Sequence, residues 1–425
     1  MSLLRNWYFV QTAAINPEAQ GVAFKDEVMG RLIQFVSSHE VGHTLGLPHN
    51  MGSSAAYPVD SLRSASFTSK YGTAPSIMDY ARFNYVAQPE DKGVALMPNI
   101  GVYDKYAIEW GYRPILDKTA EEEKPVLDSW IMAHDGDPLY RFGHQQGGDV
   151  VDPSSQTEDL GDNAMKASMY GIKNLQRIVP KLIEWTAEDG KNYDDLETLY
   201  GQVLSQFNRY MGHVSNNIGG VYENHKTYEQ EGAVYTPVAK AHQRDAMKFL
   251  QRELFQTPEW MLDQNIFNKI EYSGTVDRVR GVQVRTLNNV LSLGKMARLI
   301  EHETAMGSKA YTLTQMMSEL RRGIWSEIYN GRAIDTYRRN LQKGHIDRLA
   351  YLMTADSQRK LPSYGGYQKS TAVNTSQSDI RSVVRGELVT LRAQLRNGLA
   401  NAANTMSRYH MQDAIARIND ILDPK

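Results

Sequence analysis

Five residues at fixed spacing, His39, Glu40, His43, Gly46 and His49, give this sequence its clearest chemical signal. They form the pattern H-E-x-x-H-x-x-G-x-x-H, the longer, three-histidine form of the zinc-peptidase motif. On a helix, His39 and His43 project from one face, so both imidazoles can bind one metal ion. Gly46 can adopt the left-handed conformation that ends a helix. The resulting turn brings His49 back toward the first two histidines, so that it can bind the same metal ion as the third ligand. We predict one Zn²⁺ per chain on these histidines, with Glu40 holding the catalytic water.

A helix that carries histidines by coincidence is the alternative interpretation, and the preceding residues argue against it. Apolar side chains recur there at helical spacing and continue the face of His39 and His43. They are Val28, Leu32, Phe35 and Val36. We therefore predict an active-site helix over about residues 23–45, with the ligands at the end of its buried stripe.

A second element, Ser76-Ile77-Met78-Asp79-Tyr80, follows the third histidine after a loop rich in Gly, Ser, Ala and Pro. With this stretch the sequence resembles the metzincin superfamily, in which a methionine turn lies beneath a three-histidine zinc site. It is most similar to poorly characterised, secreted bacterial zinc-dependent metalloproteases with a helical C-terminal region. The resemblance implies that Met78 is the turn methionine in residues 76–80 and that Tyr80 binds zinc or stabilises the oxyanion. Ordinary packing of both side chains is the alternative.

Composition places the chain among globular proteins and narrows its chemistry. Its 425 residues are 41% hydrophobic and carry a net charge of −2, so nothing indicates binding to nucleic acid. No apolar run approaches the length of a transmembrane segment. The absence of cysteine excludes thiolate ligands and disulfides, so a metal must rely on His, Asp or Glu.

The N-terminal region is too short for a whole metzincin catalytic domain. Fewer than forty residues precede His39, whereas the resemblance implies a twisted sheet and a further helix before the active-site helix. We expect the C-terminal half of such a domain over residues 1–157 and an irregular α-helical bundle over 158–425, a mainly α (α+β) fold. From the first residues we expect no signal peptide in this sequence, and we expect Met1-Ser2-Leu3 to be an expression start rather than the native beginning. A fragment with a weakly occupied or distorted zinc site and impaired activity is therefore expected.

Local patterns predict the other elements. Residues 7–10 and 130–132 favour short strands, residues 51–75 a loop, and residues 105–112 a short helix. From Asp162, a plausible helix N-cap, the pattern is helical almost to the end, and Thr236-Pro237 is typical of a helix start. A loop rich in Gly, Ser, Thr and Tyr is expected over residues 359–378.

Acidic residues and histidines between residues 134 and 162 raise the possibility of a second metal site. They are His134, Asp135, Asp137, His144, Asp149, Asp152, Asp159 and Asp162. Their spacing matches no known loop motif, so a solvated acidic connector is the favoured interpretation. The isolated histidines of the helical region are expected to have no catalytic role: His213, His225, His242, His302, His345 and His410.

Two functions remain open at this point. The first is a zinc-dependent endopeptidase that hydrolyses a protein or peptide substrate, with Glu40 as the general base. The second is a non-catalytic helical scaffold or binding protein with a structural or degenerate metal site. The intact motif favours the peptidase, because a purely structural site does not need Glu40 beside an open coordination position. The resemblance implies a periplasmic, cell-surface or secreted location, and the oligomeric state is not indicated.

Overall fold

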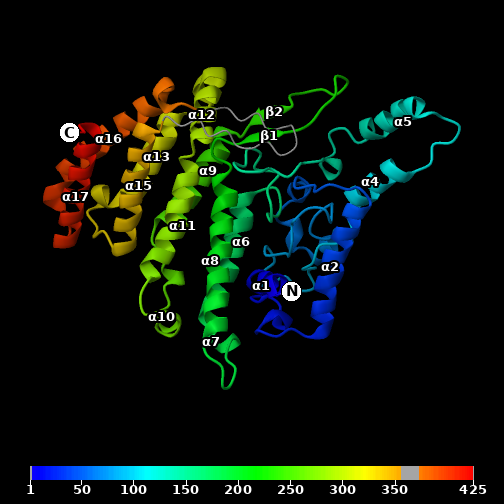
Figure 1. The fold of residues 1–425 in the computed structure, drawn as a ribbon, viewed down its shortest axis with the longest axis horizontal. Coiled ribbons are helices and arrows are strands. Elements are labelled where there is room, and N and C mark those ends of the chain that lie inside the picture. The colour runs from blue at the N-terminus through cyan, green and yellow to red at the C-terminus, as the bar shows by residue number, and fades with distance from the viewer. Residues whose placement is uncertain (1, 356–372, 425) are drawn as a thin grey trace.

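The computed structural model describes residues 2–355 and 373–424 of the chain (Figure 1). Helices dominate, and the long helices from α2 to α17 lie side by side, with α5 projecting beyond α2 at the end opposite α17. Strands β1 (Val221–Glu223) and β2 (Tyr235–Pro237) form an antiparallel pair, the only sheet within the described ranges. The predicted mainly α fold is therefore confirmed. No helix in those ranges has both the length and the apolar character needed to cross a membrane.

Helix α1 (Ser2–Thr12) contains residues 7–10, for which the sequence predicts a strand, so that prediction is wrong. Their aromatic and β-branched side chains favour a strand locally. However, Leu4, Tyr8 and Gln11 recur at helical spacing and are buried. The helix packs against α6 and α8, and this tertiary burial overrides the local preference.

Helix α2 (Asp26–Thr44) is the expected active-site helix, with bounds slightly inside the predicted range of about 23–45. Its buried face carries Val28, Leu32, Phe35 and His39, as the spacing predicts. Val36 belongs to the predicted stripe but is exposed. It follows Phe35 directly and is therefore rotated by about 100° away from that side chain around the helix axis.

The segment after α2 is more helical than predicted. The predicted loop over residues 51–75 contains helix α3 (Ala65–Tyr71), which is capped by the Ser64 hydroxyl. The predicted short helix is present as α4 (Val102–Tyr112). The strand predicted at residues 130–132 is wrong, because these residues form the last turn of α5 (Ala120–Met132). A capping box between Thr119 and Glu122 starts that helix, which then continues through Trp130 to Met132.

The predicted helical region is present, with two local differences. Asn163 rather than Asp162 caps the first helix, and Thr236-Pro237 lies in β2 rather than at a helix start. The loop expected over residues 359–378 lies mostly outside the described residues. The remaining helices are α6 (Ala164–Ile178), α7 (Leu182–Trp185), α8 (Asp194–Ser215), α9 (Lys240–Leu250), α10 (Gln264–Ile270), α11 (Thr275–Val290), α12 (Leu293–Met306), α13 (Leu313–Ile324), α14 (Ser326–Asn330), α15 (Thr336–Thr354), α16 (Asp379–Gly398) and α17 (Thr405–Leu422).

The buried apolar side chains form one continuous cluster that extends from Leu4 in α1 to Leu422 in α17. Within it, α8 lies between α6 and α11, and α15 lies between α11 and α16 (Figure 1). The N-terminal segment is therefore packed directly onto the helical region. The division of the chain into domains at residues 157 and 158 stays a prediction.

Candidate active site

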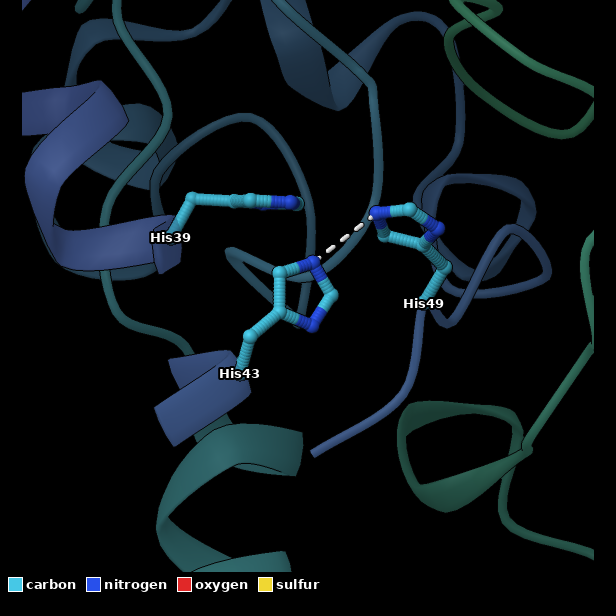
Figure 2. Close-up of side chains that lie close together, drawn as sticks. All are labelled: His39, His43 and His49. Carbon is cyan, nitrogen blue, oxygen red and sulfur yellow. Dashed lines mark hydrogen bonds between the residues drawn. The ribbon is translucent and has the colours of Figure 1, made fainter. Parts of the chain in front are cut away.

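The three predicted ligands meet at the C-terminal end of α2 (Figure 2). His39 and His43 lie one helical turn apart, and their rings are 4.8 Å apart between centroids. Gly46 ends the helix with a φ of 82°, and the amide of Leu47 donates to the carbonyl of Gly42 at 3.1 Å. This left-handed turn directs the chain back so that the His49 ring lies 4.7 Å from the His43 ring.

Each imidazole is oriented by a hydrogen bond from its Nδ1 atom. The His39 Nδ1 donates to the Ile77 carbonyl at 2.7 Å, and the His43 Nδ1 donates to the Leu47 carbonyl at 2.9 Å. The His49 Nδ1 donates to Oε1 of the Gln145 side chain at 2.8 Å. Because these oxygens accept hydrogen bonds, the proton of each neutral ring is held on Nδ1 and the lone pair is left on Nε2. Metal-binding histidines are commonly oriented in this way.

The Nε2 atoms form a donor set that fits a zinc ion. The His43 and His49 Nε2 atoms are 3.1 Å apart, and the three ligand atoms lie within 4.8 Å of one another. Zinc–nitrogen bonds of about 2.0–2.1 Å in tetrahedral geometry separate two donors by about 3.3 Å. The His39 Nε2 is buried without a hydrogen-bond partner, which a metal ion at this point relieves. Burial also lowers the pKa of His39 and so favours the neutral, metal-binding ring.

The methionine turn lies directly beneath the ligand helix. Met78 is 1% exposed and packs against Gly42, which lies between the two helical ligands. The turn itself is held by the buried carboxylate of Asp104 at the start of α4. This carboxylate accepts from the Ser76 hydroxyl at 2.6 Å and from the Ile77 amide at 2.8 Å. The Ile77 carbonyl in turn accepts the hydrogen bond from His39. Asp104 therefore helps to orient this ligand through Ile77 without touching it.

Tyr80 lies against two of the three ligands. Its ring is 5.1 Å from the His39 ring in a stacked arrangement and 4.6 Å from the His49 ring. Glu40, in contrast, is exposed, and no hydrogen bond or ion pair engages it among the described residues. The structure thus places Tyr80 against the imidazoles and leaves Glu40, the neighbour of His39 in the chain, exposed to solvent.

A cavity of about 560 Å³ opens beside the turn that carries His49. Leu45 to Pro48 form one side of it, and aromatic side chains of α4 and the following segment form the other: Tyr103, Tyr106, Trp110 and Tyr140. The Tyr112 hydroxyl donates to the Leu45 carbonyl at 2.9 Å and ties α4 to the turn. None of the three histidines lines this cavity, which is connected to the site only through the turn that precedes His49. An apolar cavity of this kind is suited to a hydrophobic side chain.

The interpretation of the acidic residues as a solvated connector is correct only in part. Asp135, Asp137, Asp149 and Asp162 are exposed, but Asp152 and Asp159 are buried. The Asp152 carboxylate pairs with Arg141 at 2.6 Å. Asp159 lies near a second buried carboxyl, Asp79 of the methionine turn, which accepts from the Ser53 hydroxyl and the Ser54 amide. Burial raises the pKa of Asp79 to about 7 and that of Asp159 well above its ordinary value.

Sequence reasoning missed the groups that support the ligands. Asp104 and Gln145 are distant from the motif along the chain, and neither residue type is unusual where it occurs. Gly101 and Asp104 do carry a local sequence signal for the start of α4. Gly101 directly precedes the helix, and the carboxylate of Asp104, the third helical residue, accepts a hydrogen bond from the Gly101 amide. Nothing in the sequence relates that cap to the methionine turn.

Three imidazoles above a methionine turn, with a glutamate beside the first ligand, define a metal-dependent hydrolase site of the metzincin type. The profile of the Met-zincin family matches residues 21–332, which is most of the chain, and the chain belongs to this family. The resemblance inferred from the motif is thereby confirmed, and membership indicates a zinc-dependent metallopeptidase. No curated protein and no solved structure shows a significant match to this chain.

Proposed function

We propose that this protein is a zinc-dependent endopeptidase whose site is built from His39, His43 and His49. The observation that carries the proposal is the common orientation of the three rings. Every Nδ1 is occupied by an oxygen acceptor, and the Nε2 atoms converge. When bound, zinc lowers the pKa of a water ligand towards neutrality and polarises the carbonyl of the scissile bond.

Glu40 serves as the general base in this proposal. Its carboxylate accepts the proton of the attacking water while the water oxygen bonds to the carbonyl carbon. It then delivers that proton to the amide nitrogen as the carbon–nitrogen bond breaks, so the leaving group departs as a neutral amine. The Tyr80 hydroxyl donates a hydrogen bond to the oxyanion during these steps. The exposure of Glu40 and the position of Tyr80 against two ligands support these roles.

The proposed substrate is a protein or peptide in an extended conformation. The cavity beside the Leu45–Pro48 turn supports acceptance of a large apolar side chain of the substrate. Within the described residues the only sheet is the short β1–β2 pair, so backbone alignment of the peptide along a long strand edge is not offered. We therefore expect slow turnover. The resemblance to exported metalloproteases supports a proposed site of action outside the cytoplasm.

The Glu40→Gln variant tests the catalytic role. Its zinc content should equal that of the unchanged protein, whereas kcat/KM on fluorescently labelled, unfolded casein should fall by about a hundredfold or more. Glu27→Gln, an exposed position in the first turn of the same helix, is the matched control and should keep full activity. If Glu40→Gln cleaves at the unchanged rate, Glu40 is not the base. If the zinc-loaded protein cleaves nothing, the scaffold alternative holds.

A further inference from the structure

A second group of metal-binding side chains lies apart from the three-histidine site. His144, Glu223 and His225 each offer one ligand atom, and these atoms lie within 4.8 Å of one another. The nearest carboxylate oxygens are 3.7 Å from the His144 Nδ1 and 3.8 Å from the His225 Nε2. Both separations are too long for hydrogen bonds, so hydrogen bonding does not account for the convergence.

Chain geometry brings the three side chains to one point. Glu223 ends strand β1, and His225 follows two residues later. Residues separated by two in extended backbone project to the same side. His144 comes from the segment whose Val151 carbonyl accepts from the Val221 amide of β1, and its ring lies 5.8 Å from the His225 ring. The prediction that His225 stands alone is therefore wrong, because a partner distant in sequence is its neighbour in space.

The two segments are fastened to each other independently of the three side chains. The Arg141 guanidinium donates to the Asp152 carboxylate at 2.6 Å and to the Glu223 carbonyl at 2.9 Å. The Glu223 amide donates to the same Asp152 carboxylate at 3.0 Å. The Val221 amide donates to the Val151 carbonyl at 2.9 Å. These contacts fix the backbone from which His144 and Glu223 extend and so preorganise the donors.

We propose that His144, Glu223 and His225 bind a second divalent transition-metal ion, for which zinc is the best match. Two imidazoles and one carboxylate are a common zinc donor set, with bonds of about 2.0–2.2 Å. Such bonds place donor atoms about 3.0–3.6 Å apart. The two carboxylate–imidazole separations of 3.7 and 3.8 Å are within a few tenths of an ångström of this range. The remaining separation is at most 4.8 Å, and rotation of the exposed His225 ring can shorten it.

The surroundings complete the site in the manner of known metal centres. Tyr235 lies opposite Glu223 in the β1–β2 ladder, and the nearby carboxylate raises the pKa of the Tyr235 hydroxyl. A hydroxyl beside a ligating carboxylate can orient it from outside the ligand shell. His225 is exposed and also lines the cavity beside the Leu45–Pro48 turn, so an ion can reach this side chain from solvent.

The second site lies next to the first along the chain. Gln145 follows His144 and accepts the hydrogen bond from His49. A metal ion on His144 therefore restrains the segment that positions the third ligand of the first site. The proposed second site does not depend on this consequence or on peptidase activity, since it rests on its own three donors.

Zinc stoichiometry of the full-length chain tests the proposal. After loading and dialysis, we expect two zinc ions per chain by elemental analysis. His225→Ala and Glu223→Gln should each lower the value to one, and His43→Ala should also lower it to one. Combining His43→Ala with His225→Ala should leave none. His242→Ala, which removes a half-exposed histidine of α9 outside both groups, is the control and should keep two.

The outcomes separate the two sites. If His225→Ala and Glu223→Gln bind as much zinc as the unchanged protein, the second site does not exist. If the unchanged protein binds one ion that is lost in these variants but retained in His43→Ala, the second site stands and the three-histidine proposal fails.

Because His225 is exposed, its substitution should leave folding intact, and a circular dichroism spectrum checks this. Cobalt titration gives an independent readout: the unchanged protein should show d–d absorption from two bound ions, and loss of one component in His225→Ala supports the assignment.

Discussion

A Cβ atom on Gly42 would lie 2.3 Å from the Sδ atom of Met78. The glycine inside the H-E-x-x-H motif and the methionine of the turn are therefore in direct contact, and the helix backbone rests on the thioether. This contact sets the distance between the ligand helix and the turn whose Ile77 carbonyl holds His39. Any side chain at position 42 must separate the two elements or displace Met78.

Gly42→Ala should lower both stability and zinc affinity. Overpacking a close contact costs about 1–3 kcal/mol of unfolding free energy. Gly30→Ala on the same helix is a matched control, because a Cβ at Gly30 meets nothing within 4 Å. There, the better helix propensity of alanine should stabilise the protein by about 0.5–1 kcal/mol. Urea unfolding followed by circular dichroism measures both variants.

The combination Gly42→Ala with Met78→Ala should recover part of the lost zinc affinity, because the clash is removed. A Gly42→Ala protein as stable and as tight in zinc binding as the unchanged chain would show that Met78 moves aside freely. The role of the contact in holding the site would then be rejected.

Gln145→Leu should weaken zinc binding at the three-histidine site by about 10–100-fold, because the His49 ring loses the acceptor of its Nδ1 proton. Gln145→Glu keeps an acceptor oxygen and should retain affinity. Competition with a chromophoric chelator, carried out in the His225→Ala background, reports this site alone. Equal affinities of the leucine and glutamate variants would contradict an orienting role for Gln145.

The ligands were predictable from the sequence because the motif is local: His39, His43 and His49 lie on one helix end and the turn that follows it. Their supports were not predictable. Asp104 and Gln145 reach the site from segments that show no periodic relation to α2. The same limit made His225 look isolated, since His144 is distant from it in sequence and meets it only in the folded structure. The strand predicted at residues 7–10 failed for a related reason, because packing on α6 and α8 decided the conformation of α1.

Zinc affinity of the three-histidine site should fall as pH decreases. Protons compete with the metal for imidazoles, and an ordinary histidine titrates near pH 6.5. Burial lowers the pKa of His39, so this ring stays neutral to a lower pH than an exposed histidine does. Affinity should be nearly constant above about pH 7 and should decrease below about pH 6.5. Chelator competition between these values and pH 5 checks this, and a flat profile would exclude histidine ligation.

A buried histidine in the helical region makes stability depend on pH for a different reason. The Trp325 Nε1 atom donates to the His345 Nδ1 at 3.1 Å, and both side chains are almost fully buried. The His345 ring must therefore be neutral to accept this bond. Burial lowers its pKa to about 3, with a smaller contribution from the charge of Arg321.

The sign of the effect follows from proton binding. Between about pH 6.5 and 3 the unfolded chain binds a proton at His345 that the folded chain excludes, so the free energy of unfolding falls as pH decreases. The loss reaches about 1.4 kcal/mol per pH unit, or about 2 kcal/mol between pH 6.5 and 5.

His345→Gln retains an acceptor for Trp325 and does not titrate, so its unfolding free energy should change less over this interval. His225→Gln, at an exposed site, should behave as the unchanged protein does. Urea unfolding at both pH values measures the effect, and excess chelator removes any contribution from metal loss. If His345→Gln and the unchanged chain show the same pH dependence, His345 is not the source of the effect.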